Sequence, residues 1–428
     1  MDGLFVAAGL VVLLVGTEAF FTLLSVLNLR HEERTVEREQ EWIREELGVD
    51  DPDELVEYHR LKTGLSLLRS WVGLGALLLV LFSGLFGDVV TALTATVDAT
   101  LVQGVVFVAG AVLAVRVFGV PFDLVDTFVV EELFGFNNQS PKLWLRDFLL
   151  QTVVSLVLVV PLAAAVLWVV ERVPLWPAAA WALLVGVSVA MLVLKPRVID
   201  PLFYEFTPVD EGSLREAVDE VFERAGFTCD QVYEMDASRR SAHSNAYFVG
   251  FGRTKRVVLF DTLVAGMDEA EVQSVLAHEL AHWKKAHIWK FIGLFAARFG
   301  IVFAVLGYLV GADWLYAPFA VPQAPYVGLT LALLWVAPVN RLTSPVNNVL
   351  SLRFERQADA YAVEVMDGES MAGALTALAA DNLATLFPHP WYETFHYDHP
   401  PIPERVRYVR QLDDEGDGSS DVDAPATG

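Results

Sequence analysis

The sequence predicts a mainly α-helical, multi-pass membrane protein with polar segments outside the bilayer. Of its 428 residues, 54% are hydrophobic and 20% are charged, and the mean hydropathy is +0.44. The formal net charge is nevertheless −24. This apolar content excludes a globally disordered chain, and it fits apolar spans with the acidic residues outside them. The acidic balance also argues against a nucleic-acid partner, because phosphates would be repelled.

Seven apolar stretches predict membrane spans, because a helix needs about 20 apolar residues to cross the hydrocarbon core. A buried helix of a soluble protein is the alternative for any one stretch, and it does not account for seven together. The third span contains Arg116, and the seventh is short and ends at Pro338. The predicted spans are Leu4–Leu29, Gly64–Phe86, Leu101–Val120, Phe148–Val170, Leu175–Leu194, Ile288–Val310 and Tyr326–Val339.

Basic residues predict the orientation of these spans. Lys and Arg gather in the loop 30–63, whereas the loops 87–100 and 311–325 contain none. Because short basic loops stay in the cytoplasm, we expect a protein of the cell membrane with its N-terminus outside. The expected division is a five-span domain (1–195), a cytoplasmic segment (196–287), two more spans (288–340), a second cytoplasmic segment (341–412) and a disordered acidic tail (413–428). The acid-rich surface also predicts a halophilic protein, since concentrated salt screens self-repulsion.

A His-Glu-x-x-His motif lies between the fifth and sixth spans. Asp268 and Glu271 predict a capping box that opens a helix. On that helix His278 and His282 are four residues apart and therefore share one face, where both imidazoles can bind one metal ion. Glu279 adjoins the first of them and can take a proton from the attacking water.

A third metal ligand is expected from another segment, because catalytic zinc usually has three protein ligands. The one cysteine, Cys229, excludes a cysteine cluster. After the seventh span, Glu355 and Asp359 are again four residues apart. Either can bind the metal while the other orients a ligating imidazole through its free N–H. Spacing alone leaves that choice open, and it also allows two exposed acids paired with Arg353 and Arg356.

Several motifs resemble those of one known family. HELAH (278–282) and NNVLSLRFERQADAYA (347–362) are similar to the metal motifs of the integral-membrane CAAX prenyl proteases of type I. These are zinc metalloendopeptidases of the HExxH gluzincin kind. The segments 136–140, 201–208, 240–248 and 396–401 also resemble family segments, and the resemblance covers roughly residues 1–410.

The resemblance implies one catalytic Zn²⁺ held by His278, His282 and Glu355. It implies that Asp359 orients a ligand and that Arg353 matches a basic position before the third ligand, although Leu352 departs from the family pattern. The implied fold has seven transmembrane helices that enclose a chamber, with a cytoplasmic zincin-like metallopeptidase domain containing a small β-sheet.

Two predicted strands follow the fifth span. Residues 245–252 and 256–261 are rich in β-branched and aromatic side chains and are joined by a Gly-Arg-Thr-Lys turn. The resemblance implies that Asn245, Ala246 and Tyr247 form an edge on which an extended substrate pairs. The alternative is that Tyr247 only packs under the metal-binding helix.

Three further histidines have weaker signals. The resemblance places His399 near the metal, where it could donate a hydrogen bond to the developing oxyanion, and the alternative is a surface residue. His243 has no assigned role, and His287 is expected at the membrane interface.

The predicted function is that of a membrane zinc protease, with a peptide or protein substrate and membrane lipid as partners. The resemblance implies removal of a C-terminal tripeptide after a prenylated cysteine. A quality-control protease of broad specificity is the alternative, and a non-enzymatic transporter or metal-binding protein is a rival that does not explain Glu279. Glu18, Arg116 and Arg298 lie in spans, where they either face a wet chamber or are paired, as Glu18 would be with an arginine. The oligomeric state is left open.

Overall fold

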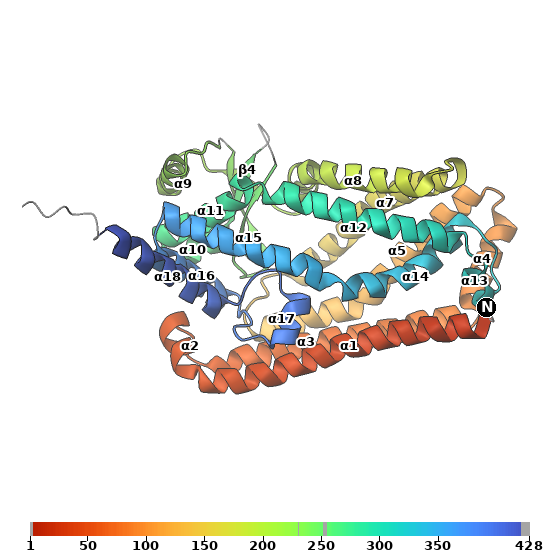
Figure 1. Ribbon diagram of the computed structural model, residues 1–428, viewed down its shortest axis with the longest axis horizontal. Helices are drawn as coiled ribbons and strands as arrows, with labels where there is room; N and C mark the ends of the chain where they lie inside the picture. The colour runs from red at the N-terminus through yellow and green to blue at the C-terminus, as the bar shows by residue number, and fades with distance from the viewer. Residues whose placement is uncertain (1–2, 230, 251–254, 421–428) are drawn as a thin grey trace, which may run out of the picture.

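Long helices run side by side along the molecule, and a polar region with shorter helices and a sheet forms one end (Figure 1). The N-terminus lies at the opposite end. The computed structural model describes residues 3–229, 231–250 and 255–420. The long helices are α1 (Gly3–Arg38), α3 (Pro52–Phe82), α5 (Thr100–Val125), α7 (Pro141–Arg172), α8 (Trp176–Leu194), α12 (His287–Val310) and α14 (Pro325–Leu342).

The remaining helices are shorter, apart from α15 and α18. Those outside the apolar bundle are α2 (Gln40–Leu47), α9 (Ser213–Arg224), α10 (Asp261–Gly266), α11 (Glu269–Lys284), α15 (Ser344–Val365), α16 (Gly368–Asp381), α17 (Pro390–His396) and α18 (Ile402–Ser420). The connecting helices are α4 (Leu85–Thr96), α6 (Glu131–Leu133) and α13 (Asp313–Tyr316). The helical elements of the described part of the chain also include two π-helical turns, η1 (Asp126–Val130) and η2 (Lys195–Ile199), and three 3-10 turns, η3 (Asp200–Leu202), η4 (Ala237–Arg239) and η6 (Ala317–Phe319).

The predicted membrane spans correspond to the long helices. Within the described residues, six helices are long and apolar enough to cross a bilayer, and the count is seven if α14 and α15 form one bent span. These two helices meet at an angle of 43°. Pro338 lies inside α14 and Pro345 opens α15, so the backbone hydrogen-bond ladder is interrupted on both sides of the bend. The multi-pass helical architecture is therefore confirmed, whereas the enclosed chamber remains a prediction.

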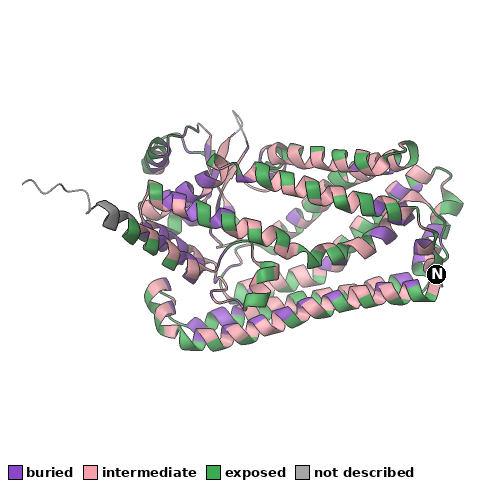
Figure 2. Cartoon of the chain, in the orientation of Figure 1, coloured by how far each residue is buried: buried purple, intermediate pink, exposed green. Residues whose placement is uncertain are grey.

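Burial is concentrated at the polar end of the molecule (Figure 2). There, α11, α15 and α16 pack with the sheet around a core that includes Leu259, Leu276 and Leu280. The apolar windows of α3, α5, α7 and α8 are each only 6% buried within the chain. Exposed Leu, Val and Phe side chains on these helices are expected of segments that contact lipid.

A mixed sheet of four strands supports the polar end. Its order is β1 (Phe206–Pro208), β2 (Val232–Met235), β4 (Arg256–Phe260) and β3 (Ala246–Val249), and β3 is an edge strand. β2 and β4 are parallel, and the β1–β2 and β3–β4 pairs are antiparallel. The two strands expected from the sequence are thus present and paired, with Tyr247 opposite Val258. Of the predicted Gly-Arg-Thr-Lys turn between them, residues 252–254 lie outside the described residues.

The C-terminal segment differs from the expectation. α18 continues to Ser420, so it covers the first part of the 413–428 segment that was expected to be disordered. Residues 421–428 lie outside the described part of the chain.

Three charged residues inside the predicted spans, Glu18, Arg116 and Arg298, have polar partners. Glu18 pairs with Arg341 at 2.9 Å, which confirms the expected pairing with an arginine. Arg116 donates hydrogen bonds to the side chains of Thr152 and Gln151 on α7. Arg298 of α12 binds the side chain and carbonyl group of Asn340, where α14 ends. Each guanidinium therefore joins two neighbouring helices at a depth where an unpaired charge would be costly.

Candidate metal centre and active site

The His-Glu-x-x-His motif lies on α11, a helix whose start is fixed by its own side chains. The Asp268 carboxylate accepts from the Glu271 backbone N–H at 2.9 Å, and the Glu271 carboxylate accepts from the Asp268 N–H at 3.0 Å. The predicted capping box is therefore confirmed. His278 and His282 leave the same face, one turn apart, and their Nε2 atoms are 3.3 Å apart.

α15 packs against α11 (Figure 1). Its Glu355 supplies a carboxylate to the same point. Glu355 Oε2 lies 3.4 Å from His278 Nε2, and Glu355 Oε1 lies 3.3 Å from His282 Nε2. One ligand atom from each of these three residues can be chosen so that all lie within 4.8 Å of one another. Two imidazoles and one carboxylate in this arrangement suit a divalent transition metal.

The other acid of the pair, Asp359, lies behind the first imidazole. It is fully buried, and its Oδ1 is 2.9 Å from His278 Nδ1. The guanidinium of Arg405 on α18 binds the same carboxylate through Nε at 3.0 Å and Nη2 at 2.6 Å. Arg405 Nη2 is also 3.3 Å from His278 Nδ1. Since the arginine can only donate, we interpret both nitrogens as donors to the carboxylate, which leaves His278 Nε2 free for a metal.

Electrostatics at this cluster fit a site built for a cation. Burial alone would lower the pKa of His278, but hydrogen bonds to Asp359 and Glu355 outweigh it and raise the pKa to about 9. Burial and the neighbouring His278 lower the pKa of His282 to about 4. Without a metal ion, His278 is therefore expected to be protonated at neutral pH, and the metal ion would take the place of that proton.

Glu279 lies next to this cluster but is not bonded to its side chains. It makes no side-chain hydrogen bond with the described residues. Burial, followed by the nearby charge of Glu355, raises the pKa of its carboxyl group, while His278 and His399 oppose that rise. A carboxylate with a raised pKa and free oxygens can accept a proton from water near neutral pH.

His399 reaches the site from the loop before α18. Its Nδ1 is 2.6 Å from Glu355 Oε2, although its side chain remains 57% exposed. His399 is therefore not a surface residue remote from the site. Its side chain also contacts Glu355, so an oxyanion would not be its only partner. The contact leaves its Nε2 as the atom available to a ligand.

One expectation for this region is corrected by the structure. Arg353 is exposed, and it makes no hydrogen bond or ion pair within the described ranges, so the arginine at the site is Arg405. Arg405 follows His399 in the pattern of the family that the sequence resembles, and it lies on the face of α18 that carries the buried residues Val406 and Val409. His287 opens α12, is 0% exposed within the chain and lies behind His282, so its place at the membrane interface stays a prediction.

The predicted substrate strand lies where it could serve the site. β3 is at the free edge of the sheet and packs against α11. Asn245, just before it, lines a cavity of about 490 Å³ together with Asn382, His399 and Arg405. Tyr247 points elsewhere, since it lines a separate cavity of about 670 Å³ with Lys195 and Trp289. Asn245 is thus associated with the metal-binding cluster, and Tyr247 is not.

His243 belongs to a different cluster. Its Nδ1 is 3.0 Å from Asn382 Oδ1, its Nε2 is 3.2 Å from Glu131 Oε2, and its ring stacks on Phe136. The side chain therefore links the start of α6 and the segment after it to the C-terminal end of α16, and it makes no contact with the metal-binding cluster among the described residues.

Comparisons with known proteins agree with this architecture. A family model described as the CAAX prenyl protease N-terminal region, with five membrane helices, matches residues 34–205. A second model, peptidase family M48, matches residues 208–413 and includes the whole metal-binding cluster. The crystal structure of S. mikatae Ste24p superposes with a TM-score of 0.83 and 26% sequence identity, covering 95% of this chain and 98% of that one.

Curated relatives give the same result. The CAAX prenyl protease 1 homolog of Oryza sativa is 34% identical over 76% of this chain and 78% of its own length. The Homo sapiens homolog is 31% identical over 73% of this chain and 74% of its own. The enzyme of Saccharomyces cerevisiae is 31% identical over 67% of each chain. With the cluster on α11 and α15, these relationships establish that the chain belongs to the CAAX prenyl protease 1 family and is a multi-pass membrane metalloendopeptidase of peptidase family M48.

Proposed function

We propose that the metal is a single zinc ion held by His278, His282 and Glu355. The observation that carries this proposal is the convergence of both Nε2 atoms and both oxygens of Glu355 at 3.3–3.4 Å. Imidazole and carboxylate ligands with a fourth open position are the usual set for hydrolytic zinc. When bound, zinc would polarise the peptide carbonyl and make the attacking water more acidic.

Glu279 is the proposed general base. Its carboxylate would take a proton from the attacking water and deliver it to the departing amine. The raised pKa of Glu279 supports this role, because a stronger base accepts the proton more readily at neutral pH. His399 would act as an imidazolium, because burial lowers its pKa but the hydrogen bond to Glu355 outweighs that effect and raises it. In that form it would donate Nδ1–H to Glu355 and Nε2–H to the oxyanion that develops on the scissile carbonyl.

The proposed substrate is a C-terminal CAAX peptide cleaved after a prenylated cysteine. Support comes from the names of the curated relatives, which are CAAX prenyl proteases. An extended peptide would pair with the free edge of β3, beginning at Asn245 and Ala246, and would pass the cavity beside His399. Tyr247 would contribute through its backbone, because its side chain lines another cavity.

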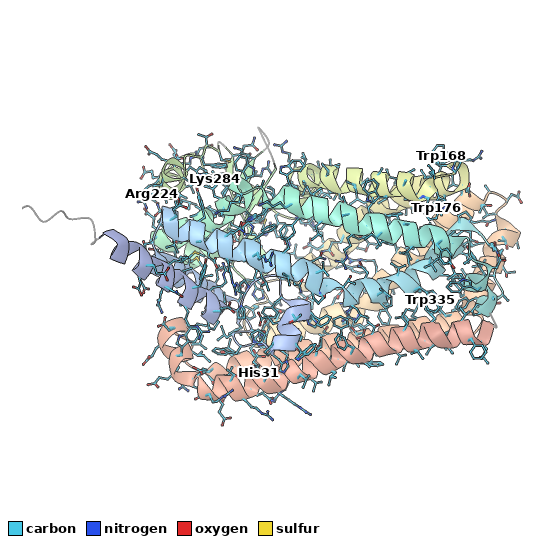
Figure 3. The ribbon with its side chains drawn as sticks, viewed as in Figure 1. His31, Trp168, Trp176, Arg224, Lys284 and Trp335 are labelled. Atoms are coloured by element: carbon cyan, nitrogen blue, oxygen red, sulfur yellow. The ribbon has the colours of Figure 1, made fainter. Side chains whose placement is uncertain are left out.

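The proposed location is the cell membrane, with the N-terminus outside and the peptidase end in the cytoplasm. The basic loop 30–63 supports this orientation, and so does the position of the N-terminus at the end remote from α11. Trp168, Trp176 and Trp335 lie toward that remote end, whereas Lys284 and Arg224 lie at the other (Figure 3). Cysteines placed at either end of a Cys229→Ser chain would report the orientation through labelling by an impermeant maleimide.

Peptide cleavage by the purified full chain tests this function. A farnesylated CAAX peptide and the same peptide without the lipid would be incubated with wild type and with Glu279→Gln. We expect cleavage after the cysteine of the lipidated peptide, a loss of about 100- to 10,000-fold in Glu279→Gln, and unchanged zinc content in that variant. Equal cleavage of both peptides would overturn the substrate, and an active, zinc-loaded Glu279→Gln would overturn the mechanism.

A further inference from the structure

We propose that His287 is a positioning residue that holds the ring of His282 in the form able to bind the metal. In this arrangement His282 carries its proton on Nδ1, donates it to His287, and presents an unprotonated Nε2 to the cluster. The inference deepens the proposed function and rests on His282 being a metal ligand.

The geometry around His287 is defined on both of its ring nitrogens. His287 Nδ1 lies 3.2 Å from His282 Nδ1, and His287 Nε2 lies 3.2 Å from Gln357 Oε1. The ring also stacks on Phe354, with 4.1 Å between centroids and 7° between planes. A fully buried ring held by a stacking partner and two polar contacts has little freedom to rotate.

These contacts determine where the protons lie. Gln357 Oε1 can only accept, so His287 Nε2 must carry a proton. A neutral His287 then has a lone pair on Nδ1 and accepts from His282 Nδ1–H. The second nitrogen of His282 is consequently unprotonated, which is the state that a metal ligand requires. If His287 Nδ1 carried the proton instead, His282 Nδ1 would have to accept it. The proton of a neutral His282 would then lie on Nε2 and block ligation.

The connection between α11 and α12 puts His287 in this place. The chain turns at Ala286, which has φ 56°, and α12 starts at the next residue. A left-handed conformation costs a non-glycine residue about 1–2 kcal/mol. A tight turn at that position brings a side chain five residues after His282 back against its ring. Sustained backbone strain beside a candidate metal centre suits a segment that orients a functional group.

The first imidazole has an equivalent support, made from different chemistry. His278 Nδ1 donates to the carboxylate of Asp359, and His282 Nδ1 donates to the imidazole of His287. Each ligating ring is thereby oriented from behind, on the nitrogen that faces away from the cluster. Loss of such a partner typically weakens metal binding about 10- to 100-fold.

Zinc affinity of the full chain in detergent, measured by chelator competition, tests the inference. His287→Phe keeps an aromatic ring to stack on Phe354 but removes the acceptor, and it should bind zinc about 10- to 100-fold more weakly. Gln357→Glu keeps an acceptor and should bind zinc within about threefold of wild type. Gln357→Leu should lose affinity by less than about tenfold, because Gln357 is exposed and water can replace it. Unfolding temperatures in EDTA would show that each variant is folded.

The outcomes separate this inference from the proposed function. Wild type that binds no zinc would overturn both. Zinc-binding wild type together with a folded His287→Phe of equal affinity would overturn only the role of His287. ¹⁵N NMR of labelled histidines in wild type gives a second readout that requires no substitution. It should show His287 protonated on Nε2 and not on Nδ1, and a proton on His287 Nδ1 would refute the arrangement.

Discussion

Removing the guanidinium of Arg405 should destabilise the peptidase end strongly, because it would leave a buried carboxylate without its cation. Asp359 is 0% exposed, and Arg405 is 8% exposed. The pair is bidentate, with contacts of 2.6 Å and 3.0 Å. After Arg405→Met, the hydrogen bond from His278 would be the only strong contact to the Asp359 carboxylate from the residues that the structure describes.

The expected size follows from the geometry. Breaking one side of a buried ion pair costs about 3–5 kcal/mol. Arg405→Lys keeps the charge but loses one of the two hydrogen bonds, which should cost about 1.5–3 kcal/mol. For a cooperative unit of about 200 residues, each kcal/mol lowers Tm by about 2–4 °C, so Arg405→Met should lower Tm by about 6–20 °C.

A double variant separates stability from metal binding. Arg405→Met with Asp359→Leu removes the uncompensated charge, so it should unfold at a higher temperature than Arg405→Met alone. Its zinc affinity should stay low, because His278 then has no acceptor for Nδ1–H. Thermal unfolding in EDTA would be measured together with zinc affinity by chelator competition. If Arg405→Met matches wild type in Tm, or the double variant is the least stable of the set, the ion pair does not stabilise the peptidase end.

Three further predictions concern pH, metal and salt. Because Glu279 must be ionised to act as a base and its pKa is raised, kcat/KM should fall with acid at a midpoint above 4.5, and a midpoint at or below 4.5 would argue against this base. Chelation of zinc should lower the Tm of wild type, since free zinc at about 1,000 times its Kd adds about 4 kcal/mol to the free energy of unfolding. Glu355→Ala should show no zinc-dependent shift in Tm, and a shift as large as that of wild type would exclude Glu355 as a ligand. With a net charge of −24, the chain should show a higher Tm in about 2 M KCl than in about 0.1 M, and a lower Tm would contradict adaptation to salt.

The architecture was largely predictable because its signals are local. A span is predicted by a run of apolar residues alone. The His-Glu-x-x-His helix is predicted by its capping box and by the i, i+4 spacing of two imidazoles. The seventh span was the least regular because Pro338 and Pro345 bend it, and the bend joins α14 to the helix that carries Glu355.

The residues behind the ligands were not predictable in the same way. Arg405 lies 46 residues after Asp359, and no periodicity links the two before the fold brings α18 against α15. Arg353, which is close to Glu355 in sequence, points to solvent because the helix turns it away from the buried face. His287 precedes an apolar run, and its contact with His282 depends on the turn at Ala286, which no sequence pattern indicated. Sequence proximity misled in the case of Arg353.

The order of the elements places a membrane hairpin between the second and the third candidate metal ligand. After His282 the chain crosses the apolar bundle in α12 and returns in α14 before it reaches Glu355. α12 and α14 pack against each other, and Arg298 joins α12 to Asn340 where α14 ends. That hairpin connects α11 to α15, and the direct packing of α15 on α11 brings three candidate ligand atoms within 4.8 Å of one another. α12 also begins with His287, whose ring contacts His282 on α11. The chain therefore passes through the membrane hairpin between the second and the third candidate ligand, and the first residue of that hairpin supports the second ligand.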